Sequence, residues 1–323
     1  MDTEEFLLVR DMFRTFAARH RTGTADVDAA ARAVAQQALD DLGLDELRRA
    51  TPPAATAQEC ALIAEEHGRQ PLTTALLGTG LLAPELLRLL GGVSTPGAKP
   101  TVAFAGDLRF PASDTPALLA WDCTGADSAL FLAADGTVTA FALGPEAPGA
   151  DLLRTVRTVS TDDAPTVLGR LGTADAQRWQ AFALVVVTAE LVGAAASFVS
   201  QAVDYARDRH QYGRPIGSFQ AVQHLLADAT VLVEACTSAT RYAAWCLDHE
   251  TPEAALTAAR VAKAEANASA AEAVYGGMQA FGGIAQTWEH TAHLYLRRVL
   301  AGAAVLATTA DLLTCLAAPE TAR

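Results

Sequence analysis

The chain has 323 residues, of which 51% are hydrophobic and 19% are charged, and its formal net charge is −13. At roughly 100–200 residues per domain, this length predicts two or three packed units, and the hydrophobic content excludes a disordered chain. The acidic charge argues against nucleic acid and anionic membranes as partners, because both are bound through basic surfaces. Aromatic residues make up only 6% of the chain, which favours helices over strands.

The first part of the chain has the apolar spacing of amphipathic helices. Met12, Phe13 and Phe16 recur at intervals of one, three and four residues and lie on one face of a first helix. Further helices are predicted over residues 26–42, 57–67 and 71–90. Glycines follow each of them and provide the stop signals. We therefore assign residues 1–95 to an N-terminal helical domain.

The pattern changes after Lys99-Pro100, where short apolar runs alternate with turn residues. Strands are predicted over residues 101–105, 118–121, 130–133 and 138–143. Asp135-Gly136 has the sequence of a tight hairpin turn. We expect residues 96–165 to form a small antiparallel β domain.

The last part, residues 166–323, has the pattern of long helices joined by short connections. Helices are predicted over residues 179–209, 219–248, 252–281 and 287–317. Thr251-Pro252-Glu253 supplies an N-cap, a proline in the first turn and an acidic first turn. These features predict a C-terminal four-helix bundle and a mainly α protein.

The stretch from Trp179 to Val203 is long enough to span a bilayer. However, Gln180, Glu190 and Gln201 interrupt it, and an ionised carboxylate at mid-bilayer is costly. We interpret the stretch as the buried helix of a soluble bundle with no membrane partner.

The five cysteines are scattered along the chain and contain no Cys-x-x-Cys pair. This usage is typical of reduced, buried thiols in a cytoplasmic protein. The acidic start of the chain does not resemble a signal peptide.

Two long motifs in the last part resemble those of the acyl-CoA dehydrogenase flavoprotein family. The first is residues 204–228, DYARDRHQYGRPIGSFQAVQHLLAD. The second is residues 277–284, GMQAFGGI, followed by Thr287-Trp288-Glu289-His290. The resemblance implies the family's fold, which consists of an N-terminal helical domain, a middle β domain and a C-terminal four-helix bundle.

The same motifs carry candidate cofactor-binding residues. An arginine at a helix end beside a glycine turn can meet a diphosphate with its planar donor fork. The resemblance implies that these elements hold the ADP half of FAD, largely across a subunit interface. The residues concerned are Arg209, Gln211, Tyr212, Gly213, Gln220, Gln279, Gly282 and Gly283. The alternative is a capping arginine with ordinary turn glycines.

The sequence departs from the family pattern where the reaction would take place. The Thr-Glu-Pro and Trp-(Ile/Val)-Thr runs that face the flavin ring are absent, as is the C-terminal Glu-Gly-Thr that commonly carries the base. The alternative base position falls near Ala181–Leu184, where no carboxylate occurs. This pattern resembles the short subunit of the heterotetrameric acyl-CoA dehydrogenases that degrade steroid side chains in actinobacteria.

That resemblance implies a subunit of an FAD-dependent enzyme that desaturates an acyl-CoA thioester at its α and β carbons. A longer partner subunit would supply the base, in an α2β2 complex. Two alternatives remain open. In the first, the chain is self-sufficient and uses Glu190 as the base, because burial would raise the pKa of that carboxyl. A Glu190 paired with an arginine would not serve this way. In the second, the chain is a flavin-free scaffold that catalyses nothing.

Glu289, His290 and His293 form a cluster that raises the question of a metal site. No distant third ligand group accompanies them. We interpret Thr287 as the N-cap of the last helix, with Glu289 in its first turn, and we predict no metal.

Overall fold

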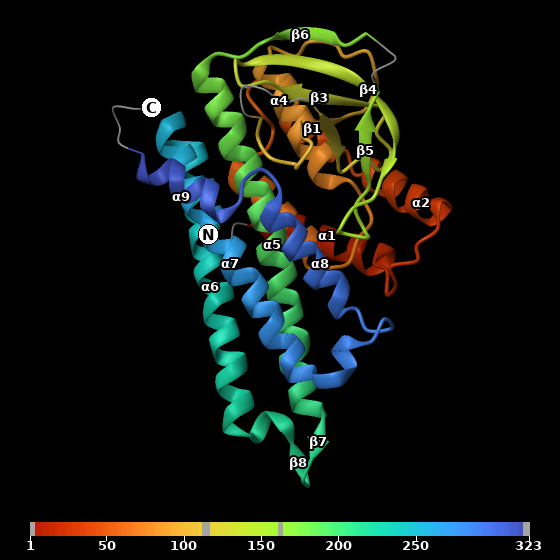
Figure 1. Ribbon diagram of the computed structural model, residues 1–323, viewed down its shortest axis with the longest axis vertical. Helices are drawn as coiled ribbons and strands as arrows, with labels where there is room; N and C mark the ends of the chain where they lie inside the picture. The colour runs from red at the N-terminus through yellow and green to blue at the C-terminus, as the bar shows by residue number, and fades with distance from the viewer. Residues whose placement is uncertain (1–3, 112–116, 161–163, 319–323) are drawn as a thin grey trace.

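The computed structural model describes residues 4–111, 117–160 and 164–318. Figure 1 shows an N-terminal group of helices and a small β domain at one end of the molecule, and a bundle of long helices that extends away from them. The predicted mainly α fold with a small middle β domain is confirmed.

The N-terminal part packs short helices against the upper half of the bundle. Its elements are α1 (Glu4–His20), α2 (Ala29–Asp40), the 3₁₀ turn η1 (Leu44–Arg48), α3 (Ala57–Gly68), the π-helical turn η2 (Leu76–Leu82) and α4 (Ala83–Leu89). The helix predicted from residue 71 starts later than expected. The side-chain oxygen of Gln36 accepts a hydrogen bond from the Ala75 N–H at 2.8 Å. A side chain from α2 thus provides the hydrogen-bond acceptor for a backbone N–H in the segment that the sequence pattern assigned to a helix.

The β domain contains one six-stranded sheet. Its strands are β1 (Pro100–Ala105), β2 (Leu118–Trp121), β3 (Ser128–Leu132), β4 (Thr137–Ala147), β5 (Val156–Val159) and β6 (Thr166–Arg170). The strand order is β3-β1-β2-β5-β4-β6, and β3 also pairs with β4, so β1 to β5 close into a ring. The tight turn at Asp135-Gly136 joins β3 to β4, and Gly136 has a φ of 89°.

The sheet differs from the expected antiparallel one because β1 and β3 run parallel. The chain leaves β2, which is antiparallel to β1, and crosses over to the other edge of β1 before it enters β3. An apolar run specifies a strand but not its direction, so only the tertiary structure decides this pairing. The sequence pattern did not predict β5 and β6, and β6 lies beyond residue 165.

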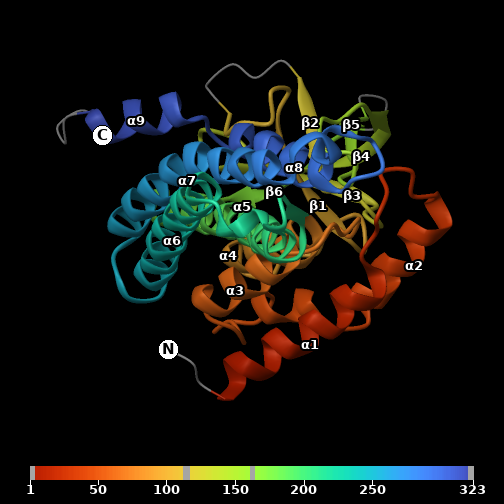
Figure 2. The same ribbon diagram turned by 90° about the horizontal axis from the view of Figure 1, so that it is seen from below.

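The bundle is built around α5 (Thr173–Asp208). The other elements are β7 (His210–Gln211), β8 (Arg214–Pro215), the 3₁₀ turn η3 (Ile216–Ser218), α6 (Gln220–His249), α7 (Pro252–Phe281), the 3₁₀ turn η4 (Gly282–Gln286), α8 (Ala292–Ala304) and α9 (Thr309–Ala317). Helix α5 is long and apolar enough to cross a membrane, but 89% of its most apolar window is buried inside the structure. Figure 2 shows α5 enclosed by α6, α7 and the N-terminal helices.

The single helix predicted over residues 287–317 is wrong in two respects. It begins at Ala292, and Thr287 instead closes η4 by donating a hydrogen bond to the Ile284 carbonyl at 2.9 Å. It is also broken at Leu306, whose φ is 70°. The Leu306 carbonyl accepts a hydrogen bond from Phe110 N at 2.9 Å, and its N–H donates to Leu108 O at 2.8 Å. These bonds to the β1–β2 connection compete with helix continuation.

Helices α3 and α5 cross in backbone contact. A Cβ atom added to Gly193 would lie 1.9 Å from the Glu65 carbonyl oxygen, and one added to Gly68 would lie 2.0 Å from the Glu190 carbonyl oxygen. Only hydrogen at these two positions permits this separation of the helices. The crossing therefore places the end of α3 directly beside Glu190.

Replacement Gly193→Ala is expected to lower the free energy of unfolding by about 3 kcal/mol, because the added methyl group must push two backbones apart. Urea denaturation followed by circular dichroism measures this change. The control is Gly23→Ala, since a Cβ atom there meets nothing within 4 Å. Equal stability of the two variants would contradict the crossing.

Candidate functional site

The end of the bundle far from the β domain carries the first motif. Helix α5 ends at Asp208, and Arg209 caps it with an extended backbone. The Arg209 carbonyl then accepts a hydrogen bond from Ile216 N at 2.7 Å, which closes the β7–β8 hairpin at its base. Figure 1 shows this hairpin as the tip of the molecule. We call residues 205–220 and 279–284 together the hairpin end.

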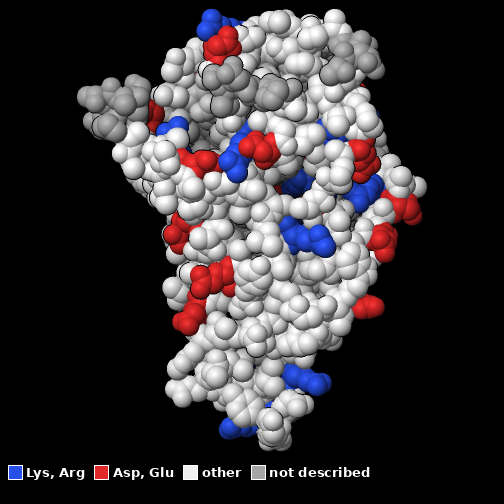
Figure 3. All heavy atoms as spheres, in the orientation of Figure 1, with Lys and Arg blue, Asp and Glu red and all other residues white. Residues whose placement is uncertain are grey.

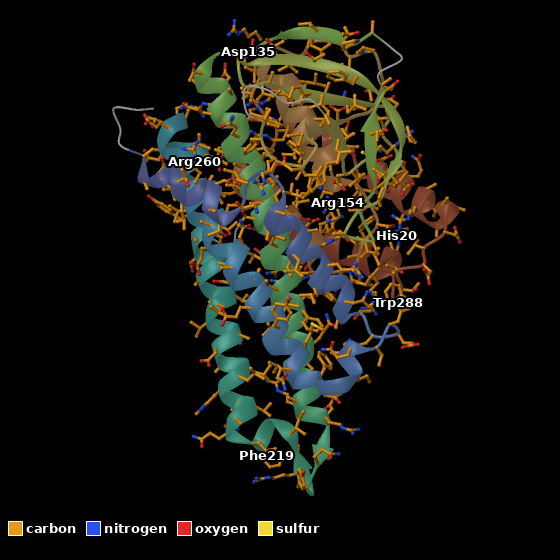
Figure 4. All side chains as sticks on the ribbon, viewed as in Figure 1. His20, Asp135, Arg154, Phe219, Arg260 and Trp288 are labelled. Atoms are coloured by element: carbon orange, nitrogen blue, oxygen red, sulfur yellow. The ribbon has the colours of Figure 1, made fainter. Side chains whose placement is uncertain are left out.

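Two consecutive residues with positive φ shape the hairpin. Tyr212 has a φ of 53° and Gly213 a φ of 78°, as a two-residue turn between right-twisted strands requires. The turn leaves Tyr212 92% exposed. Phe219, labelled in Figure 4, meets the Tyr212 ring edge to face at 6.2 Å and lies under the Arg214 guanidinium at 4.2 Å. An exposed tyrosine held in a disfavoured conformation is typical of a binding surface.

The second motif lies at the same end of the bundle. Helix α7 ends at Phe281, whose ring packs on Tyr205 with centroids 4.7 Å apart. Around it, Ala202, Ala206, Leu226 and Ala280 form a buried cluster with Ile216, Val222 and Phe281. The contact joins two segments that are far apart in sequence, since Tyr205 and Phe281 are 76 positions apart. All eight candidate cofactor residues lie at the hairpin end, and all eight are exposed in the single chain.

The hairpin end fits a diphosphate-bearing cofactor such as FAD. Arg207 is paired with Asp204 at 3.2 Å, but within the described part of the chain the guanidinium of Arg209 has no hydrogen bond or ion pair. A Cβ atom added to Gly282 or Gly283 would meet nothing within 4 Å, so a ligand has open access to that backbone. On the face shown in Figure 3, the described residues at this end include basic side chains and no acidic ones. An anion is therefore favoured here.

At the other end of α5, charged side chains fill the junction of the three domains. We call His67, Asp122, Asp151, Arg154, Glu190 and Arg298 the buried charge network. Each of their side chains is at most 6% exposed. Arg154 pairs with Asp122 at 2.7 Å and with Glu190 at 2.5 Å. Its guanidinium also lies 4.2 Å from the centre of the Trp121 ring. Figure 4 shows Arg154 where the β domain meets the helices.

Glu190 is the most heavily engaged carboxylate of the network. It accepts a hydrogen bond from His67 Nδ1 at 2.9 Å and lies 3.7 Å from Arg298. Burial alone would raise the pKa of Glu190, but the two guanidinium groups and the His67 hydrogen bond hold that pKa well below 4.5. A carboxylate in this environment does not accept a proton at neutral pH. The structure therefore contradicts the hypothesis that Glu190 is the base and supports the paired alternative.

The family resemblance gives two segments in which the catalytic base could lie. Both segments contribute to the lining of a single cleft of about 690 Å³. Leu184 comes from one of them, and Leu306 and Ala307 come from the other. Among the described residues that line the cleft, Asp107 and Asp311 carry carboxylates, and both lie within 3.5 Å of Arg109. Hydrogen bonds from Thr308 also lower the pKa of Asp311. Neither apolar base position holds a proton acceptor.

The histidines near the start of α8 are engaged with other residues. His290 Nδ1 accepts a hydrogen bond from Ala292 N at 3.1 Å, and the His293 ring stacks on Trp288 with centroids 4.5 Å apart. Among the described residues, no group of three or more His, Cys, Asp or Glu side chains is arranged to hold a metal ion.

Sequence reasoning missed the buried charge network and a buried amine. Lys263 of α7 is fully buried and donates hydrogen bonds to Asn267 and to the Gly302 carbonyl. Burial lowers its pKa to about 7. Its two hydrogen bonds tie α7 to the end of α8. The local sequence around each of these residues gives no sign of its role. The role becomes visible only when the residues that it contacts in the folded chain are known.

Comparisons with known proteins agree with this fold and site. A family model described as "Acyl-CoA dehydrogenase, C-terminal domain" matches residues 172–305. The chain is 32% identical over 260 residues to acyl-CoA dehydrogenase IpdE2 of Mycobacterium tuberculosis, covering 79% of this chain and 75% of that one. The chain therefore belongs to the acyl-CoA dehydrogenase family of oxidoreductases.

Two solved structures share the fold over nearly their whole length. The Tcur3481-Tcur3483 steroid ACAD G363A variant matches with a TM-score of 0.77 at 21% identity, covering 97% of this chain and 96% of that chain. The ChsE4-ChsE5 complex from Mycobacterium tuberculosis matches with a TM-score of 0.76 at 19% identity, covering 99% of each chain. The predicted resemblance to the family is confirmed.

Replacement Glu190→Gln is expected to lower the free energy of unfolding near neutral pH by about 3–5 kcal/mol, since it leaves buried arginines without a charge partner. The pKa of Glu190 is lower in the folded than in the unfolded chain, so its stabilisation is present above pH 4.5 and is lost as pH falls below that value. The difference between wild type and variant should shrink accordingly. Urea denaturation at several pH values measures it.

The matched control for this experiment is Glu46→Gln, because the Glu46 side chain is 74% exposed. It should change stability little at any pH. A Glu190→Gln variant as stable as the control, or a loss that does not vary with pH, would show that the network is not charged as described.

Proposed function

We propose that this chain is the short subunit of a heteromeric, FAD-dependent acyl-CoA dehydrogenase whose longer partner supplies the catalytic base. One observation carries the proposal. The chain has exposed candidate cofactor-binding residues, including an arginine, at the hairpin end. Neither of the two positions at which the family resemblance places a catalytic base holds a proton acceptor. One chain thus has the residues for holding a cofactor without those for removing a proton.

The division of labour follows from the residues. Bound FAD would accept the hydride that leaves the β-carbon of the acyl-CoA. Arg209 would bind the diphosphate, and the Tyr212 ring would offer a flat contact surface. Gln220 and Gln279 would orient the cofactor through their amides, with Gly282 and Gly283 allowing close approach. The partner's carboxylate would remove the α-proton, because loss of a general base costs about 10²–10⁴ in rate.

The relatives support the choice of substrate and assembly. One solved structure is titled a steroid ACAD and another a complex of two chains, ChsE4 and ChsE5. We therefore propose an acyl-CoA with a steroid side chain as substrate and an α2β2 assembly with the cofactor at the contact between unlike chains. The four buried, unbridged cysteines, Cys60, Cys123, Cys236 and Cys246, support a cytoplasmic location.

Co-expression with the product of the adjacent gene should yield a yellow heteromer with one short chain per long chain. Visible absorption and the subunit ratio measure this. The short chain purified alone should not reduce an artificial electron acceptor in the presence of an acyl-CoA. A colourless heteromer would favour the flavin-free scaffold, and acyl-CoA oxidation by the short chain alone would refute the need for a partner.

Replacement Arg209→Ala in the heteromer is expected to weaken FAD binding at least tenfold, because a charge-assisted hydrogen bond is worth about 1.5–3 kcal/mol. Flavin retained after gel filtration, together with a titration of the stripped protein, measures it. Arg207→Ala is the matched control, since Arg207 is paired with Asp204 on the same turn. Equal flavin content in both variants would remove Arg209 from the cofactor site.

A further inference from the structure

The outward side of helix α6 is apolar although it faces solvent in the single chain. Val231 is 66% exposed, Tyr242 62% and Trp245 39%. Figures 1 and 2 both show α6 at the outer edge of the bundle, on the side away from α8. Exposed apolar side chains that follow one another along a helix are typical of a surface that another chain covers.

These three side chains belong to one continuous stripe. Positions that recur at intervals of three and four residues share a face of a helix. Between residues 227 and 249 all the positions of this face are exposed and uncharged at neutral pH, and the stripe is ~33 Å long at 1.5 Å per residue. Its members are Ala227, Val231, Ala235, Ser238, Tyr242, Trp245 and His249. We call them the α6 stripe.

The α6 stripe has small side chains before its midpoint, Ser238, and large rings after it. A second copy of the same stripe that packs on it in the opposite direction therefore brings each ring against a small side chain. The opposed pairs are Tyr242 with Ala235, Trp245 with Val231, and His249 with Ala227. A parallel second copy would place rings against rings. The stripe is thus complementary in size to itself, and only when the two helices run antiparallel.

The rings of the stripe are already ordered in the single chain. Tyr242 stacks on Trp245 with centroids 6.2 Å apart, and Trp245 stacks on His249 with centroids 4.7 Å apart. His249 Nδ1 donates a hydrogen bond to the Trp245 carbonyl at 2.8 Å, which fixes the outermost ring. Side chains that are held before association lose less conformational freedom when a second chain covers them.

Two opposite charges border the midpoint of the stripe. Glu234 and Arg241 lie on the same side of it, because positions seven apart nearly coincide around a helix. Within the described part of the chain Glu234 makes no ion pair, and Arg241, 69% exposed, reaches Glu65 only at 3.9 Å. A twofold axis across the helix at Ser238 reverses its direction but keeps its sides. Each Glu234 then lies opposite Arg241 of the second copy, and the symmetry forms this pair twice.

We propose that the α6 stripe is the contact between two copies of this chain, packed antiparallel about a twofold axis at Ser238. Size and charge both match a second copy, which favours the same chain over an unlike one. The stripe begins seven residues after Gln220, so the hairpin end stays available to the longer partner. In the heteromer the contact joins two short subunits and so two unlike pairs, and this last step rests on the proposed function.

Sedimentation velocity of the full chain, alone and in the heteromer, tests the contact. The chain alone should form a dimer, and the heteromer should contain two copies of each chain. Glu234→Arg and Arg241→Glu should each weaken the self-association about tenfold, because each places like charges opposite one another at two symmetry-related positions. The double variant should recover it, since reversing both charges restores opposite signs only where α6 faces its own copy.

The matched control is Glu46→Arg, which reverses a charge on a 74% exposed side chain of the N-terminal domain and should leave the mass unchanged. The proposal is overturned if the short chains do not associate with each other, if the control weakens association as much, or if the double variant fails to recover it, as an unlike partner on α6 would cause. Flavin absorption of the same samples separates the two proposals. A yellow heteromer with one copy of each chain refutes only the α6 contact, and a colourless dimer of short chains refutes only the cofactor role.

Discussion

The buried pairing of Arg154 with Asp122 and Glu190 is the interaction on which the rest of the structure depends. These residues come from the β4–β5 connection, the β2–β3 connection and α5, so the three ion-paired groups connect the β domain with the bundle. His67 adds the N-terminal domain. Buried charges are tolerated only when each has its partner in good geometry. The network therefore constrains the relative placement of all three domains, and the glycine crossing of α3 and α5 makes that placement possible.

The same network explains why Glu190 is unsuited to act as a general base. A general base must be able to take up a proton near neutral pH. Glu190 is surrounded by two guanidinium groups and an imidazole, which stabilise its ionised form. The cleft that the two base segments share is lined at these positions by Leu184, Leu306 and Ala307. None of these three side chains can accept a proton, while the residues proposed to bind a diphosphate are exposed at the far end of α5.

The distribution of positive charge follows a simple rule in this acidic chain. Most arginines in the interior are paired with carboxylates, as Arg48 is with Glu85 at 2.9 Å. Among the described residues, the Arg209 guanidinium at the hairpin end makes no hydrogen bond or ion pair, unlike these interior arginines. Because paired charges contribute little to the outside field, an unpaired guanidinium attracts anions more strongly than a paired one.

The sequence by itself determined the elements with local causes. Apolar periodicity and caps such as Thr251 specified the long helices, Asp135-Gly136 specified its hairpin, and the two motifs identified the family and the candidate cofactor residues. Only the tertiary structure decided the parallel pairing of β1 with β3, the break at Leu306 and the role of Glu190. The physical reason is distance along the chain. His67 and Glu190 are 123 positions apart, and their contact depends on how closely two glycines let helices approach. From the sequence alone, burial of Glu190 suggested a raised pKa and therefore a catalytic base. The residues that surround Glu190 in the folded chain lower its pKa instead.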